Sequence, residues 1–247
     1  MNICRAFIAV AGISALAAGC PAAAPLEHEF EDEYLAPVPE ESMQPVYEAR
    51  REVDQAEVAL ERAEAELRRT DLQVERAENL VERSELALED AETNFEAAQE
   101  TLDPERIEEA RQPLIEAHDE LREAEALLQY GEAFRDWREV QRDYREQFLV
   151  AQEARNELTE AQVVQDEGLE APGPTVAEFE QQYESEMLEA RRMLAEAQDA
   201  RADADAQRSA WRRVAGVEEP DDVEEPDDVE QPEQVEEPEE EVDGIED

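Results

Sequence analysis

Residues 46–102 decide the fold and read VYEARREVDQAEVALERAEAELRRTDLQVERAENLVERSELALEDAETNFEAAQETL. Apolar or small residues recur in this stretch at alternating steps of three and four positions, and the residues between them are mostly charged or polar. A 3.5-residue apolar repeat held over this length predicts a coiled-coil seam along one long helix. The larger members of the seam are Val46, Val53, Leu60, Leu67, Val74, Val81, Leu88, Phe95 and Leu102. The smaller members are Ala49, Ala56, Ala63, Thr70, Ala77, Ser84, Ala91 and Ala98.

The partner of this helix is predicted to be the next helix of the same chain. A row of small residues lets another helix approach closely, while the large row fills the remaining groove. Asp103 and Pro104 supply an N-cap residue and a proline at the first helical position. The seam then resumes out of phase at Ile107, as expected where a chain turns back. Pro113 should either kink this second helix or move the turn toward residues 111–113.

A third helix is predicted over 176–215. Thr175 and Glu178 have the spacing of a capping box, and Gly216 provides a C-terminal cap. The expected fold is all-α, a long antiparallel coiled-coil hairpin (helices 46–102 and 104–166) with the third, shorter helix packed on its distal half. That arrangement places Trp211 near Gly131. Because a three-helix cross-section needs larger side chains, the aromatic residues between 130 and 148 are interpreted as core.

The N-terminus has the pattern of a secretory signal. Residues 1–19 combine Arg5 with a short apolar run, which is too short to span a bilayer, and they are predicted to be a signal peptide. The run closes with Leu16-Ala17-Ala18-Gly19-Cys20, which resembles a bacterial lipobox. The resemblance implies lipidation of Cys20 by acyl chains such as palmitate, and hence membrane anchoring. The alternative is an ordinary secretory signal that ends near a cysteine.

Two further segments carry no helical pattern. Residues 20–45 are rich in proline and acid and are predicted to be an extended linker that forms no core. Residues 216–247 contain a hexapeptide repeat in which Val-Glu-Glu-Pro or Val-Glu-Gln-Pro is followed by two acidic or amide residues. These residues are predicted to be a disordered, acidic tail. Carboxylates without a preorganised cage bind Ca²⁺ weakly, so the tail is not interpreted as a metal site.

The charge of the chain restricts its partners. The sequence has 22 basic and 71 acidic side chains and a formal net charge of -49. Phosphate groups would be repelled, so nucleic acid is not expected as a partner. The acidity fits either a high-salt habitat or simply an acidic coiled coil. Both cysteines, Cys4 and Cys20, precede the helices, so no disulfide framework or cysteine-based metal site is expected.

One segment of the second helix interleaves aromatic residues with arginines, and it is the candidate partner-binding site. In one interpretation its arginines face an anionic partner and its aromatics serve as anchors. In the other, acidic neighbours neutralise the arginines, and this structural interpretation is favoured. The candidate residues are Trp137, Arg135, Arg138, Arg142 and Arg145. The four arginines continue the steps of three and four positions that start at Ile107, so the first helix or a partner must still contact them.

No enzymatic chemistry is expected. His118 is the one histidine in the predicted helices, and no phosphate loop or spaced ligand set appears, so no catalytic residue, cofactor or metal is assigned.

The lipobox followed by Ala/Glu/Arg heptads, as in residues 57–67 and 108–128, is similar to uncharacterised alanine-rich domains of bacterial envelope lipoproteins. This resemblance implies a spacer or scaffold in the cell envelope, anchored in the outer membrane and facing the periplasm or the cell surface. The hairpin also looks like that of periplasmic adaptor subunits, which implies an alternative role in docking on a transport or secretion complex. A protein partner in the envelope or self-association is expected, through a surface beyond Leu128.

Overall fold

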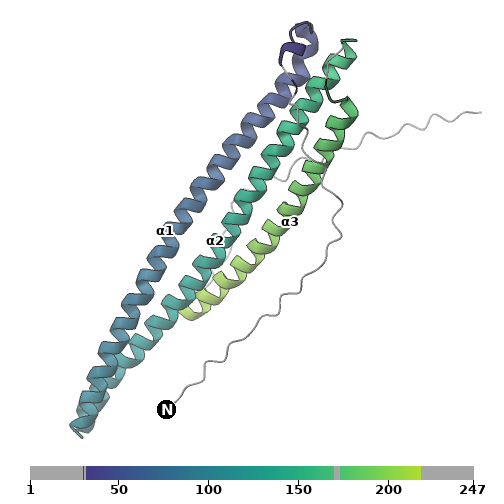
Figure 1. Cartoon of the computed structure of the whole chain (residues 1–247). Helices are drawn as coiled ribbons and strands as arrows, with labels where there is room; N and C mark the ends of the chain where they lie inside the picture. The colour runs from purple at the N-terminus through teal and green to yellow at the C-terminus, as the bar shows by residue number, and fades with distance from the viewer. Residues whose placement is uncertain (1–29, 31, 170–172, 218–247) are drawn as a thin grey trace, which may run out of the picture.

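The computed structural model describes residues 30, 32–169 and 173–217, and in these ranges it contains helices and no strand. Helix α1 spans Gln44–Glu100, α2 spans Pro104–Asp166 and α3 spans Val176–Ala215. α2 lies between the other two helices and packs against both, whereas α1 and α3 make little direct contact (Figure 1). The predicted all-α hairpin with a third, shorter helix is confirmed. The helices form one elongated layer, not the three-helix cross-section that was expected to enclose a common core.

The predicted seam of α1 is also confirmed, and its small residues are buried more completely than its large ones. Leu60 and Leu67 remain partly exposed although their small neighbours are buried. When two helices approach closely, small side chains occupy the centre of the contact and large ones fill its edges. Gly131 of α2 belongs to this contact, because a Cβ added to it would lie 3.6 Å from Cγ2 of Val74. The buried small row is Ala49, Ala56, Ala63, Thr70, Ala77, Ser84 and Ala91.

The chain turns where the sequence predicts. The Oδ1 of Asp103 accepts a hydrogen bond from the backbone N–H of Glu105 at 3.1 Å and so caps α2. α2 continues without interruption through Pro113, so the alternative of a turn at 111–113 is wrong. Pro113 is exposed, which lets water satisfy the carbonyl that loses its helical donor. Leu102, predicted as the last large seam residue, instead lies in the turn with φ 57° and is 85% exposed.

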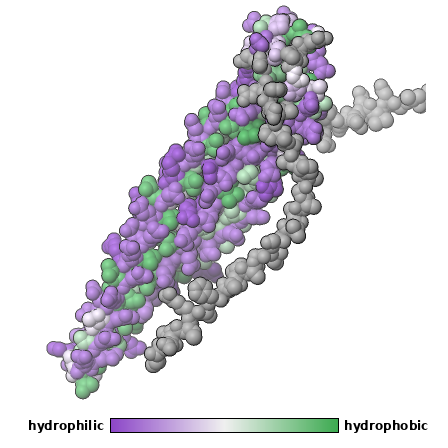
Figure 2. Space-filling model, viewed as in Figure 1, coloured by the Kyte–Doolittle hydropathy of each residue, from purple (hydrophilic) through white to green (hydrophobic). Residues whose placement is uncertain are grey.

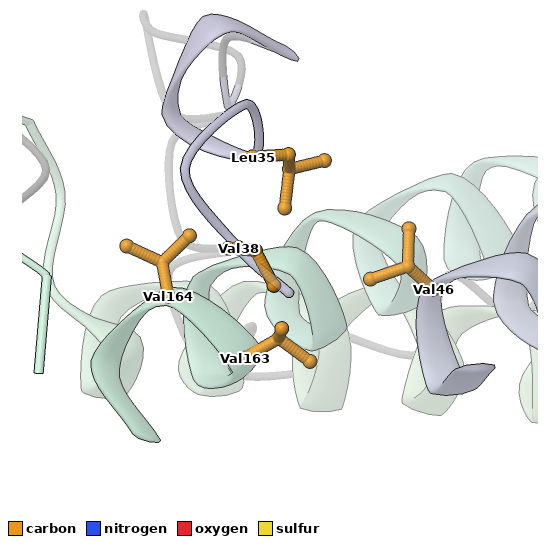
Figure 3. Packing of buried hydrophobic residues seen from close by; sticks show 5 residues of the cluster. All are labelled: Leu35, Val38, Val46, Val163 and Val164. Atoms are coloured by element: carbon orange, nitrogen blue, oxygen red, sulfur yellow. The ribbon is translucent and has the colours of Figure 1, made fainter. Parts of the chain in front are cut away.

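The predicted extended linker needs a correction for residues 32–43. Two short 3₁₀ helices, η1 (Asp32–Tyr34) and η2 (Glu40–Met43), cover the end of the hairpin. Leu35 and Val38, in the segment between the two 3₁₀ helices, are buried on a surface that α1 and α2 form, so proline-rich composition does not prevent packing. The resulting buried cluster comprises Leu35, Val38, Val46, Val163 and Val164 (Figure 3).

α3 begins and ends as predicted. The Thr175–Glu178 capping box is present, and Gly216 ends the helix with φ 65°. Phe179 is buried in a cluster with Leu158 and Ala161 of α2. Within the described ranges, no helix combines the length and the apolar character needed to cross a membrane. The predicted signal peptide (1–19), Cys20 and the tail after Val217 lie outside the described residues.

Candidate functional site

Aromatic residues of α2 meet α3 at the candidate site. Tyr130 stacks on Trp211 of α3, with ring centroids 5.9 Å apart and planes at 9°. This contact confirms the predicted placement of Trp211 beside Gly131. Further along α2, Phe134 meets Trp137 edge to face at 5.0 Å. Tyr144 is buried, and burial raises the pKa of its hydroxyl, an effect that the nearby Arg145 offsets only in part.

Arg138 and Trp137 together link α2 to both other helices at this site. Its guanidinium carbon lies 4.2 Å from the ring centroid of Trp137, a cation–π distance. Arg201 of α3 approaches the same ring to 5.7 Å. On the other side, Nη1 of Arg138 lies 2.5 Å from Oε2 of Glu66 on α1. The arginine row was expected to contact the first helix or a partner, and at Arg138 the contact is made by α1.

The remaining candidate arginines also have neighbours in their own chain. The guanidinium of Arg145 lies 5.3 Å from the ring centroid of Tyr144. The hydrogen bond to Asp136, assisted by nearby carboxylates, raises the pKa of Arg135. The ion pairs are Arg135–Asp136 at 2.9 Å, Arg142–Asp143 at 2.7 Å and Arg142–Glu146 at 3.7 Å. These contacts favour the structural interpretation of the arginine row.

A second polar layer lies near the open end of the hairpin, and sequence reasoning did not identify it. Glu160 is only 3% exposed, and its carboxylate accepts a hydrogen bond from Nη2 of Arg50 at 2.8 Å. Nδ2 of Asn156 donates to the same carboxylate at 3.1 Å. Gln152 is buried one turn away from Asn156, and its Oε1 has no hydrogen-bond partner. The sequence signal that could have revealed this layer is Glu160 itself, an acidic residue on the apolar face of α2 opposite the start of α1.

These polar groups are suited to holding helices in register. A buried carboxylate that lost its cation would be costly, so each such pair favours one alignment of the helices. In the described part of the chain, no three His, Cys, Asp or Glu side chains converge closely enough to hold a metal ion. No protein-family model matches the chain, and comparison with curated proteins and with solved structures found no similar protein.

Proposed function

We propose that the protein is a lipid-anchored, non-enzymatic spacer or scaffold of the bacterial cell envelope. The observation that carries the proposal is the hairpin itself, in which α1 and α2 pair along their length through seams internal to the chain. At 1.5 Å per residue, a helix of the length of α1 reaches about 85 Å. Such a hairpin can hold two points far apart without a partner helix to stabilise it.

The direction of the hairpin supports this role. α1 starts at the end covered by η1 and η2, and the turn at Asp103 lies at the opposite end (Figure 1). An anchor at Cys20 would therefore place the covered end near the membrane and direct the turn away from it. Two acyl chains hold a protein on a membrane stably, whereas the acidic helices would gain nothing from an anionic lipid surface.

The anchor is tested by replacing Cys20. Cys20→Ala should move the protein from the membrane fraction to the soluble fraction, and globomycin should block maturation of the unmodified chain. Cys4→Ala is the matched control, because it removes the other cysteine and should leave fractionation unchanged. Membrane association that survives Cys20→Ala would contradict the anchor.

A second candidate is an adaptor that docks on an envelope complex through the aromatic–arginine segment. Trp137 favours it, since its ring is only half-buried and is framed by the guanidinium groups of Arg138 and Arg201. Aromatic and arginine side chains are the residues on which protein interfaces most often depend. A photo-crosslinker at Trp137 tests the idea in cells. Products confined to the protein's own helices would contradict docking there.

A further inference from the structure

The outer face of α1 carries a row of arginines that take no part in the packing of the hairpin. Arg62, Arg69, Arg76 and Arg83 recur every seven residues and so share one side of the supercoiled helix. All four are exposed. None of them forms a hydrogen bond or an ion pair with another residue in the described ranges. Their charge is therefore available to a further partner.

Apolar residues accompany this row. Val58, Leu72 and Leu86 are 46%, 55% and 62% exposed, which is unusual for side chains of this size. Together with Ala65 and Asn79 they alternate with the arginines at steps of four and three. We call this stripe the Arg–Leu face; it consists of Val58, Arg62, Ala65, Arg69, Leu72, Arg76, Asn79, Arg83 and Leu86. Apolar patches along the rod interrupt its hydrophilic surface in Figure 2.

The Arg–Leu face is positive although the chain is strongly acidic. Charged residues on a helix are normally neutralised by neighbours three or four positions away. Arg76 and Arg83 have no acidic residue at any of these positions. Glu66 is the acidic residue within that spacing of Arg62 and Arg69, and Arg138 of α2 already binds it.

The described part of the chain ends at the level of this face along the hairpin axis. Tyr130 stacks on Trp211, and the adjacent Gly131 faces Val74 of α1. α3 ends at Ala215, one turn after Trp211. The chain therefore leaves α3 at the level of Val74, two residues before Arg76.

A polar contact at the level of α3 also lies beside the arginine row. Arg138 joins Glu66 to Trp137, and Arg201 of α3 lies over the same indole ring. Glu66 is one helical turn from both Arg62 and Arg69. Two arginines of the row thus lie one turn from the ion pair that joins α1 to the helix on which α3 packs.

We propose that the Arg–Leu face is the docking site for residues 218–247 of the same chain. Eighteen of these 30 residues are acidic, none is basic, and Val223, Val229 and Val235 recur among them. The row from Arg62 to Arg83 is about 31 Å long, and 30 residues can span about 100 Å, so length is not limiting. Carboxylates meet the arginines, and the valines cover the exposed apolar side chains.

Tethering makes this contact effective. An isolated ion pair at the surface contributes only about 0–1 kcal/mol. A segment attached to the same molecule, however, has a local concentration in the millimolar range, and several pairs can form together. Because the contact is electrostatic and exposed, salt weakens it. The segment would then shield the apolar row until high ionic strength or an acidic competitor displaces it.

Photo-crosslinking in the full chain tests the proposal. A benzoylphenylalanine at Leu72, irradiated in low salt, should join the tryptic peptide 70–76 to the peptide 214–247, since no Arg or Lys follows Arg213. Irradiating a mixture of unlabelled and 15N-labelled chains identifies the source, because docking within one chain gives no mixed-isotope products. The same probe at Ile115, an exposed apolar residue of α2, is the matched site and should give several-fold less crosslinking to the peptide 214–247.

Charge reversal supplies the second comparison. The triple variant R69E/R76E/R83E should reduce the crosslink from Leu72 to the peptide 214–247 at least fivefold, and so should 1 M NaCl. Because the substitutions remove the tryptic sites at 69, 76 and 83, Leu72 lies in the peptide 69–106 of this variant. The variant R51E/R191E/R208E makes the same change in net charge at exposed arginines outside the face and should keep the product. Equal yields in the two variants, mixed-isotope products, or crosslinks to another protein in place of the C-terminal segment would each overturn the proposal.

Discussion

At the scale of single residues, the hairpin depends on small side chains in the centre of its contact. Thr70 shows how strictly the position is used, because its hydroxyl is buried and donates back to the carbonyl of Glu66 at 3.0 Å. Gly131 occupies the equivalent small position on α2, opposite Val74. Glycine inside a helix is entropically unfavourable, and nothing here requires a positive φ.

Gly131→Ala should therefore stabilise the protein. The new methyl group would meet Val74 at an ordinary van der Waals distance of 3.6 Å, so it fills space without a clash. Alanine is favoured over glycine in a helix interior by about 1 kcal/mol. The expected result is an increase of about 0.5–1 kcal/mol in the free energy of unfolding, measured by urea denaturation and circular dichroism.

Gly131→Leu is the matched control, because it has a similar gain in helix propensity but forces a large side chain against Val74. Overpacking of this kind costs about 1–3 kcal/mol, so this variant should be destabilised. Stabilisation by both substitutions would show that α1 and α2 do not approach closely at this level.

At the scale of helices and connections, heptad periodicity was sufficient to predict most of what forms. The first helix was placed at 46–102 and spans 44–100, and Asp103 and Thr175 cap the following helices as expected. Caps and periodic seams are local signals, which is why one sequence reveals them. The covering of the hairpin by Leu35 and Val38 was missed, because it depends on a surface created by helices that come later in the chain.

The candidate site was predictable in part for the same reason. Interleaved aromatics and arginines identified the segment, and the seam position of Arg138 indicated contact with either α1 or a partner. Glu66 of α1 meets Arg138, and Arg201 of α3 meets the adjacent Trp137. These contacts depend on how each helix is rotated about its own axis, which periodicity does not specify. The burial of Gln152 and Glu160 was missed because polar residues on an apolar face have no periodic signature of their own.

The start of α3 gives a prediction at this scale. Thr175→Ala removes the hydroxyl that accepts the N–H of Glu178, and loss of an N-cap costs about 1 kcal/mol. Amide exchange over residues 176–190 should accelerate about fivefold, the factor that 1 kcal/mol represents. Residues 84–100, far from α3, are the internal control and should exchange at an unchanged rate.

The capping box also predicts a pH dependence. Hydrogen bonds from the backbone and the hydroxyl of Thr175 lower the pKa of Glu178. A depressed carboxyl pKa stabilises the folded state above the unfolded-state pKa, and this contribution is lost as pH falls toward the folded-state pKa. Glu178→Gln should remove this local dependence while keeping a capping side chain. Protection of the first turn of α3 that is independent of pH in the parent chain would contradict the box.

At the scale of the whole molecule, net charge opposes the compact state. A formal charge of -49 is distributed over helices that must lie side by side, and neutralising ion pairs are mostly exposed and within one helix. Each such pair contributes about 0–1 kcal/mol, and salt weakens it. Salt weakens the repulsion among the excess carboxylates as well, and these greatly outnumber the arginines. Screening of repulsion should therefore dominate.

The melting temperature at pH 7 should consequently rise as NaCl increases from about 0.05 to 1 M, while the Debye length falls from more than 10 Å to about 3 Å. Helicity measured by circular dichroism should rise with it if low salt leaves the helices partly unfolded. The control uses the same chain near its isoelectric point of about 4.1, where protonation removes most of the excess charge and the salt effect should shrink. A melting temperature that is insensitive to salt at pH 7 would contradict repulsion as the main opposing term. Full helicity without added salt would count against a high-salt habitat as the reason for the acidity.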